Sequence, residues 1–383
     1  MRLFKYRFLI LMIVSLTAAC QPGVSPQDIL STSTPLPEPT ATLLTAVSPT
    51  LTPYPTSLPT SSATITPIGI ASPTSLPLTR LLFTGVIVPA RCVQAALDVN
   101  QNPNYPYEEV RQIIQGADLA VGTINATMSD YPPHTGCVRT YVLVGSSNNA
   151  DALQWAGFDV MSTATNHIKN CGLSNCGDRA FNDTLDNLRR VGIQSVGAGK
   201  NHAEAIQPVV ATVNGIRFGI VSLGQIEPMA FATEDTPGIA ILNEENLKKA
   251  IASAREVSDV VIVMPHWGPE DISTPNWIQR DLAQQLVQAG ADLVVGNHTH
   301  VVQAIQEIDD VPVFYGLGNF VFDQGLRSHQ QGVILIVTFE GSQYVGYELI
   351  PTHVDQDGRV HIADDDEAEE ILKRIQEASD AIE

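Results

Sequence analysis

The sequence feature that most constrains the fold of this chain is a set of three apolar runs, each of which leads into a histidine. The clearest is 291–295, which precedes Gly296-Asn297-His298-Thr299-His300. In an extended strand, residues two apart share a face, so we expect His298 and His300 to aim at one point. Of the other two runs, one leads into His266 and the other leads into Asn166 and His167. Histidine is a common ligand of Zn, Mn and Fe, so the pattern indicates a metal site.

Alternation of strand-like runs with helical periodicity predicts an α/β fold. Helices are expected at 107–115, 150–156, 179–190, 243–256 and 276–288. Strands are expected at 81–88, 119–121, 159–161, 216–223, 260–263, 311–315 and 333–339. In open α/β sheets, sites form at the carboxyl ends of strands, where these histidines fall.

The amino terminus is typical of an exported lipoprotein. Basic residues at Arg2, Lys5 and Arg7 precede an apolar stretch over 8–19 and then Cys20. A basic region followed by a short apolar region describes a signal peptide, here 1–19, with Cys20 as the lipidated first residue. The alternative is an ordinary signal peptide followed by an incidental cysteine.

Residues 20–79 are rich in Ser, Thr and Pro, and after Cys20 their only side chains charged at neutral pH are Asp28 and Glu38. Such a segment buries too little apolar surface to offset its chain entropy. We interpret it as an extended, proline-stiffened tether. With the lipid on Cys20, the tether predicts a protein anchored to the outer face of the cell membrane.

The chain carries 41 acidic and 21 basic residues, a formal net charge of −20. Without a basic stripe, a nucleic-acid partner is not expected. Residues 80–355 suit one large domain, followed by an acidic segment at 356–383. Apolar residues from Ile371 to Ile382 have helical spacing, so this segment is expected to end in an amphipathic helix.

Four cysteines remain besides Cys20, an even number in an exported protein, so two disulfides are expected. Four cysteines allow three pairings. We predict Cys171–Cys176, which are close in sequence, and Cys92–Cys137. Bound zinc is the alternative for the close pair.

Three motifs in order make the chain similar to a known family. The segments 266–270 (HWGPE), 296–300 (GNHTH) and 315–323 (YGLGNFVFD) resemble the CapA family of capsule or poly-γ-glutamate synthesis proteins. The resemblance covers about 80–351. It implies a metallophosphatase-like fold, with two facing β-sheets flanked by helices in a four-layer sandwich.

The same resemblance implies a metal site from which carboxylates are missing. Asn166, His266 and His298 would surround one metal position, and His300 would serve the other. The family's Asp and Glu are replaced by Val86 and Asn125. A carboxylate balances the charge of two cations and often bridges them. We therefore predict at most one divalent metal (Mn, Zn or Fe), with Asn125 as an additional ligand.

Five further residues are candidates by the same resemblance. His167 would act as a general acid beside the leaving group, with a residual scaffold role as the alternative. Glu270 would reach a ligand or substrate, or form a loop salt bridge instead. The remaining candidates are expected at the rim of the site, namely Arg91, Asn319 and Asp323.

The resemblance implies a cell-surface protein of capsule or poly-γ-glutamate assembly or anchoring, with the polymer or capsule-assembly proteins as partners. Two alternatives remain open. One is a non-catalytic protein that binds a polymer or partner, and the other is a single-metal phosphoesterase-like hydrolase. A polyanion is a poor ligand for so acidic a chain unless a local basic patch exists.

Overall fold

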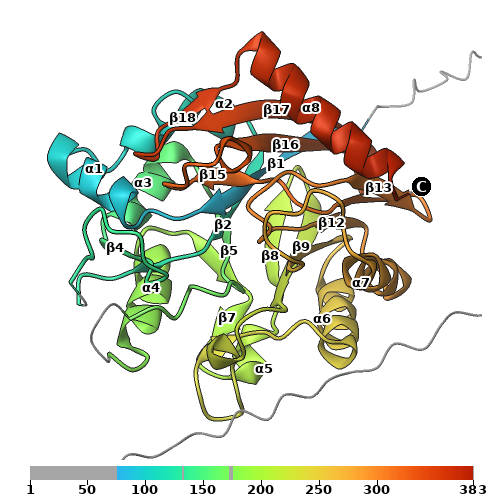
Figure 1. Ribbon diagram of the computed structural model, residues 1–383. Helices are drawn as coiled ribbons and strands as arrows, with labels where there is room; N and C mark the ends of the chain where they lie inside the picture. Colours follow the sequence, from blue (N-terminus) through green and yellow to red (C-terminus); the bar gives the residue numbers. More distant parts are fainter. Residues whose placement is uncertain (1–75, 132, 172–175, 383) are drawn as a thin grey trace, which may run out of the picture. The chain divides into compact units, whose positions relative to one another are not determined.

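Two β-sheets lie face to face in the part of the chain described by the computed structural model, residues 76–131, 133–171 and 176–382 (Figure 1). The predicted signal peptide, Cys20 and nearly all of the predicted tether lie outside the described residues. The described residues form one compact unit, which includes the acidic segment up to residue 382.

The first sheet is mixed. Its central strand, β1 (Leu78–Ile87), pairs in parallel with β2 and antiparallel with β16. The order across the sheet is β18 (Val360–Ile362), β17 (Gln343–Val354), β16 (Gln331–Glu340), β1, β2 (Leu119–Ile124), β5 (Val160–Ser162) and β6 (Gln194–Val196), and β15 (Asn319–Val321) pairs with the end of β1. Strands covered on both faces are mostly apolar, and β2 is buried along its whole length.

The second sheet is built on three parallel pairings between β9, β11, β12 and β14. Its order is β13 (Ile305–Ile308), β14 (Val311–Phe314), β12 (Leu293–Val295), β11 (Val260–His266), β9 (Ile216–Gly224) and β8 (Val209–Val213). Two short pairs lie outside both sheets, namely β3 (Thr127–Met128) with β4 (Val144–Gly145), and β7 (Ala198–Gly199) with β10 (Gly238–Ile239).

Helices cover the outer face of each sheet. The first sheet packs on α1 (Cys92–Asn100), α2 (Arg111–Gln115), α3 (Asn149–Ala156) and α4 (Arg179–Arg190), and the second on α5 (His202–Ala205), α6 (Glu244–Val257) and α7 (Trp277–Gln288). Single 3-10 turns occur at Tyr105–Tyr107, Pro228–Ala230 and Arg327–His329. A separate apolar core fills the space between the sheets. The predicted α/β fold of two facing sheets flanked by helices is therefore confirmed.

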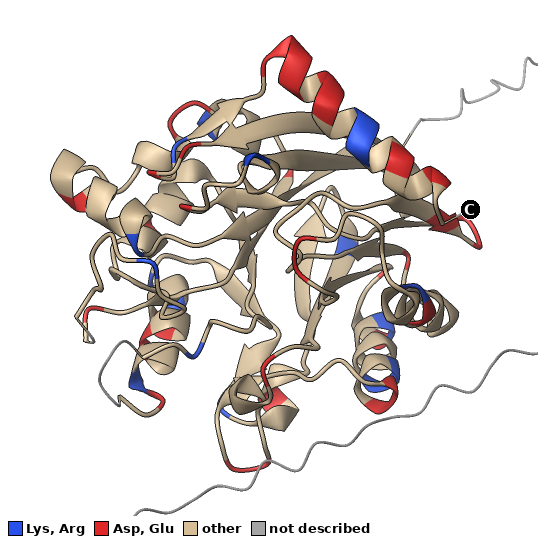
Figure 2. Cartoon of the chain, viewed as in Figure 1, with Lys and Arg blue, Asp and Glu red and all other residues tan. Residues whose placement is uncertain are grey.

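The predicted terminal helix is present as α8 (Asp365–Asp380). Asp364 caps it by accepting a hydrogen bond from the Glu367 backbone N–H, and acidic residues fill its first turn (Figure 2). Negative charge there is stabilised by the helix dipole. Ile371 and Ile375 pack into the core between the sheets, while α8 contacts both β13 and β17. None of the described helices is long and apolar enough to cross a membrane.

Most predicted elements appear within two residues of their expected bounds, and α4 appears at the predicted bounds. The predicted helix 107–115 is wrong in its first half. A 3-10 turn with Pro106 inside it comes first, and the helix begins only at Arg111. Helix α1 and strand β17, which pairs with β16, were not among the predicted elements.

The structure contains two disulfides, Cys92–Cys137 and Cys171–Cys176, with Cα–Cα distances of 3.9 and 5.6 Å. They join the same cysteines that the sequence analysis paired. The first ties the start of α1 to the loop around residue 137, 45 residues away. It therefore fixes that loop beside the end of β1.

Candidate functional site

Most of the predicted site residues gather where parallel strands of the two sheets end. Asn125 follows β2, Asn166 and His167 follow β5, His266 ends β11, and His298 and His300 follow β12. The two strand edges are joined by a buried hydrogen bond of 2.9 Å from the Asn297 amide to the Thr123 hydroxyl. Residues far apart in the sequence thus form one buried polar cluster, as expected at the carboxyl edges of an α/β fold.

The extended geometry expected for His298 and His300 is wrong. Both residues have positive φ, 108° and 61°, so the chain turns sharply after β12. Positive φ is uncommon for any residue other than glycine. Their Nε2 atoms nevertheless lie 3.9 and 3.8 Å from the same Glu270 oxygen. The two rings thus converge through a turn, not along one face of a strand.

Gly296 makes this turn sterically feasible. A Cβ there would lie 2.2 Å from the Tyr315 carbonyl oxygen and 2.4 Å from the Trp267 indole nitrogen. Those two atoms are joined by a hydrogen bond of 2.9 Å in which the indole donates. Only glycine lets the backbone pass this close, so the histidine segment is held against β11 and β14.

Three potential ligand atoms converge at the predicted metal position. His266 Nε2 lies 3.0 Å from Asn166 Oδ1 and 3.2 Å from His298 Nδ1. Ligands about 2.1 Å from a cation lie about 3.0–3.4 Å from one another in octahedral or tetrahedral sets. The spacing of these atoms therefore fits one divalent cation.

Asn125 is oriented differently from the predicted ligand. Its Oδ1 accepts a hydrogen bond from the His167 backbone N–H at 2.9 Å, which leaves its amide NH₂ directed at Asn166 Oδ1 at 3.0 Å. A backbone N–H can only donate, so this orientation of the amide is determined by its partner. Asn125 thus holds Asn166 in place and presents a donor to the cluster.

Burial keeps the histidines of this cluster neutral. It lowers the pKa of His298 to about 3 and that of His300 to about 4, and it holds the pKa of His266 well below its ordinary value. The neighbouring histidines lower these pKa values further. Neutral imidazoles have free lone pairs at neutral pH, which metal binding requires.

The second metal position has an apolar side chain where the resemblance expects a carboxylate. Val86 is fully buried in an apolar cluster with Leu143 and Phe322. His300 donates Nδ1–H to Asn319 Oδ1 at 2.8 Å, because the Asn319 amide nitrogen already donates to the His329 carbonyl. Within the described residues, no group of three or more His, Cys, Asp or Glu side chains is arranged to hold a metal.

His167 is held by Asn170, a residue that is not among the predicted site residues. Asn170 Oδ1 accepts from the Leu143 backbone N–H and lies 3.0 Å from His167 Nδ1. His167 Nδ1 must therefore carry the proton. Burial, the largest cause, lowers the pKa of His167, and Arg91 lowers it further. At neutral pH its Nε2 is a proton acceptor, which suits a general base better than the predicted general acid.

The predicted rim residues form two polar groups. The Arg91 guanidinium forms a two-pronged ion pair with Asp323, which also accepts from the Cys92 backbone N–H at 3.0 Å. Glu270 is half exposed, and burial together with the Asp271 charge raises its pKa. Asn319 orients His300. Arg91 and Asp323 are thus paired with each other, while Glu270 faces the two histidines.

Comparison with known proteins shows the family. Residues 80–324 match the family model described as bacterial capsule synthesis protein PGA_cap. The chain belongs to this family.

Two relatives illustrate the extent of the similarity. The capsule biosynthesis protein CapA of Bacillus anthracis is 28% identical over 262 residues, which cover 66% of this chain and 62% of that protein. The PGA biosynthesis protein CapA of Bacillus subtilis strain 168 is 26% identical, over 71% of this chain and 70% of that protein. The match thus spans less than two thirds of the length of the first relative.

Among solved structures, the family member described here is similar to the NAD nucleotidase of Haemophilus influenzae. The TM-score is 0.45 and the identity 11%, over 79% of this chain and 56% of that chain.

Sequence reasoning about this PGA_cap protein missed a pair of residues beside His300. His329 has its ring centroid 6.4 Å from that of His300, and its Nε2 lies 2.6 Å from Asp271. His329 follows no apolar strand-like run, so the pattern that identified the other histidines could not identify it. Its position depends on the turn Arg327–His329, which returns the chain to the cluster after β15.

Proposed function

We propose that this chain acts in the assembly or anchoring of a capsule polymer such as poly-γ-glutamate, at the outer face of the membrane, with a lipid anchor on Cys20. The observation that carries the proposal is the match of the PGA_cap family model to residues 80–324. It is supported by relatives named for capsule and PGA biosynthesis. Capsule-assembly proteins and the polymer itself are the proposed partners.

We further propose that one divalent cation belongs to the site, with Mn, Zn and Fe as candidates. Asn166, His266 and His298 would hold it, because their donor atoms already lie at ligand spacing. A divalent cation bound there would polarise a substrate oxygen or a water molecule. His167 is placed to accept a proton through Nε2, since Asn170 holds its Nδ1–H.

Between the two remaining alternatives, the site favours a binding protein over a single-metal phosphoesterase. All three proposed ligands are neutral, and apolar Val86 is packed where the resemblance expects a carboxylate. A two-metal mechanism clamps the attacking and leaving oxygens together, and a single cation cannot do this. Assay of bis(4-nitrophenyl) phosphate with added Mn²⁺ distinguishes the two, and turnover at an ordinary enzyme rate would favour the hydrolase.

The cellular role is tested by deleting the gene and measuring cell-associated polymer. We expect the polymer at the surface to decrease, and the wild-type chain to restore it. A Cys20→Ala chain should be released from the membrane or stall in processing, and it should restore less polymer. Unchanged surface polymer after deletion would contradict the proposed role.

A further inference from the structure

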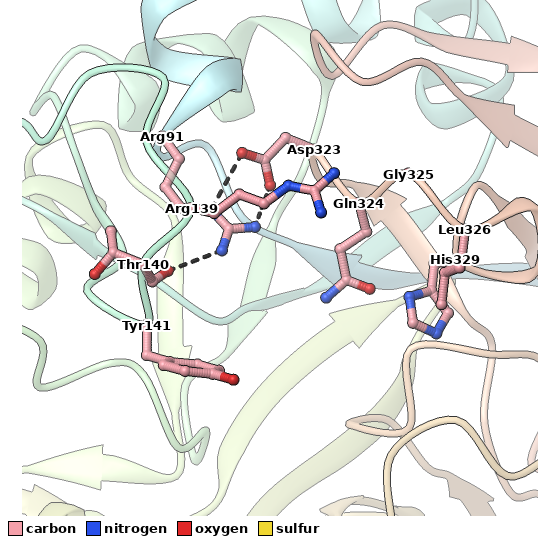
Figure 3. A pocket seen from close by; sticks show the side chains of 9 residues that line it. All are labelled: Arg91, Arg139, Thr140, Tyr141, Asp323, Gln324, Gly325, Leu326 and His329. Carbon is pink, nitrogen blue, oxygen red and sulfur yellow. Dashed lines mark hydrogen bonds and ion pairs between the residues drawn. The ribbon is translucent and has the colours of Figure 1, made fainter.

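A cavity of about 660 Å³ opens beside the histidine cluster. Figure 3 shows Arg91, Arg139, Asp323, Gln324 and His329 around it, with the Tyr141 ring directed toward the same space. The cavity combines cationic, aromatic and amide side chains at the end of β15. None of these side chains is among the proposed metal ligands.

The lining carries a net positive charge although the chain is acidic. The only carboxylate of the lining, Asp323, is neutralised by Arg91 and the Cys92 backbone N–H. Arg139 has no carboxylate, carbonyl or aromatic partner among the described residues. In that part of the chain the other arginines all have such a partner, except Arg280 on α7.

The fold places the exposed Arg139 side chain at the cavity. The Cys92–Cys137 disulfide attaches the loop that carries Arg139 to the residue after Arg91. The guanidinium lies beside Gly325, where a Cβ would be in ordinary contact with Arg139 Nη2 at 3.5 Å. The disulfide restrains the loop backbone, and the guanidinium itself is left without a partner among the described residues, so it is available to a carboxylate.

The cavity also offers a hydrogen-bond acceptor. The Gln324 side-chain oxygen is buried and has no hydrogen-bond partner within the described part of the chain. A buried polar atom without a partner is costly, so a ligand that donates an N–H there would recover that cost. An unpaired guanidinium and an unpaired amide oxygen on one cavity match a carboxylate and a neighbouring amide N–H.

The cavity adjoins the histidine cluster. The Arg91 guanidinium lies 4.8 Å from the centre of the Phe322 ring, and that ring lies 5.3 Å from His300. His329, which lines the cavity, is 6.4 Å from His300 on the other side. A chain-like ligand in the cavity would therefore extend toward the proposed metal ligands.

We propose that this cavity is a subsite for an acidic polyamide, in which Arg139 binds a free carboxylate and Gln324 accepts from an adjacent amide N–H. The proposal deepens the proposed function, because a γ-linked glutamate chain repeats these two groups in every residue. Arg139 is thus the local cation that lets an acidic protein bind a polyanion. Asp323 takes no part in binding, since Arg91 already neutralises it.

The test measures equilibrium binding of a labelled oligo-γ-glutamate to the full chain, compared with the same oligomer carrying carboxamides in place of carboxylates. We expect Arg139→Gln to weaken binding of the acid oligomer about tenfold, or about 1.4 kcal/mol. Arg280→Gln, the matched control on α7, should leave it unchanged. The carboxamide oligomer should bind the wild type as weakly as the acid oligomer binds Arg139→Gln.

A second variant addresses the possibility that Arg139→Gln disturbs the loop. Gly325→Leu keeps every charge and fills the space beside the guanidinium, so it should also weaken binding, with unfolding temperatures near that of the wild type. Equal losses in Arg139→Gln and Arg280→Gln, no binding by the wild type, or equal binding of the carboxamide oligomer would each overturn the subsite.

The binding result and the cellular result are separable. Loss of surface polymer on gene deletion, together with no oligomer binding, would overturn the subsite and leave the cellular role intact. Unchanged surface polymer, together with Arg139-dependent binding, would overturn the cellular role and leave the subsite intact.

Discussion

The two sheets contribute unequal halves to the candidate site. At the end of the second sheet, His266 and His298 keep their nitrogen atoms at ligand spacing. At the end of the first sheet, the residue after Gly85 is Val86, packed in an apolar cluster, and Asn125 turns its oxygen away from the cluster. One half brings neutral histidines together, while the other is partly apolar core.

The difference shows how a site can lose charge without losing its shape. Buried polar groups must be hydrogen-bonded, and the amides at the end of the first sheet satisfy this by bonding to Asn166 and to backbone N–H groups. An apolar side chain in place of a buried carboxylate avoids the cost of desolvating a charge. The first half is therefore stable without a cation. The histidines of the second half remain neutral and available.

The largest expected effect is that of pH, and it tests whether the second half is built from neutral histidines. His266, His298 and His300 have folded pKa values far below those of the unfolded chain. The unfolded state therefore binds more protons between about pH 6.5 and pH 4, and stability falls as the pH decreases through this range. The expected slope is about 1.4 kcal/mol per pH unit for each histidine.

Denaturant unfolding of the metal-free chain at a series of pH values measures this slope. His300→Asn should flatten it by the contribution of one proton, and above pH 7 the three histidines should add no dependence. A stability that does not change between pH 7 and pH 5 would show that these side chains are not buried as neutral imidazoles.

Restoring the carboxylate on the first half should be costly. Val86→Asp would place a charge in an apolar cluster with no cation to pair it, which typically costs about 3–5 kcal/mol. We expect a lower unfolding temperature in a chelator and partial recovery on adding Mn²⁺ or Zn²⁺. Val86→Ala is the control, because it loses packing only and should not respond to metal. An unchanged unfolding temperature for Val86→Asp would contradict the packed first half.

Metal content tests the second half directly. We expect at most one cation per purified chain, and His298→Ala should reduce its affinity about 100-fold by removing a ligand. His167→Ala should leave metal content unchanged, since His167 is assigned to proton transfer. Elemental analysis after dialysis measures the metal content of the wild type and of both variants, and metal titration measures the affinity. Two tightly bound cations in the wild type would show that the first half is not degenerate.

The smallest expected effect concerns His167, which lies at the end of the first sheet. Asn170→Asp keeps the oxygen that accepts from the Leu143 backbone and adds a charge beside His167 Nδ1. A nearby carboxylate favours the imidazolium, so the pKa of His167 should rise. NMR titration of the ring protons measures it. An unchanged pKa would mean that the Asn170 contact does not determine the protonation of His167.

Sequence patterns alone predicted much of the fold, because helices and strands depend mainly on residues that are near neighbours in the sequence. Periodicity located α4 and the strands before the histidines, and the three motifs indicated the family that the comparison then showed. The four cysteines allowed three pairings, and the structure contains the predicted one, Cys92–Cys137 with Cys171–Cys176. These are properties that local propensity and short motifs encode.

Tertiary structure alone decided how the site residues meet. The orientation of Asn125 depends on partners 41 and 42 residues away, and the contact between His266 and Asn166 spans 100 residues. The positive φ of His298, the apolar surroundings of Val86 and the unpaired state of Arg139 depend likewise on packing between distant segments. Hydrogen-bond partners and burial are set by the whole fold, so no local pattern could specify them.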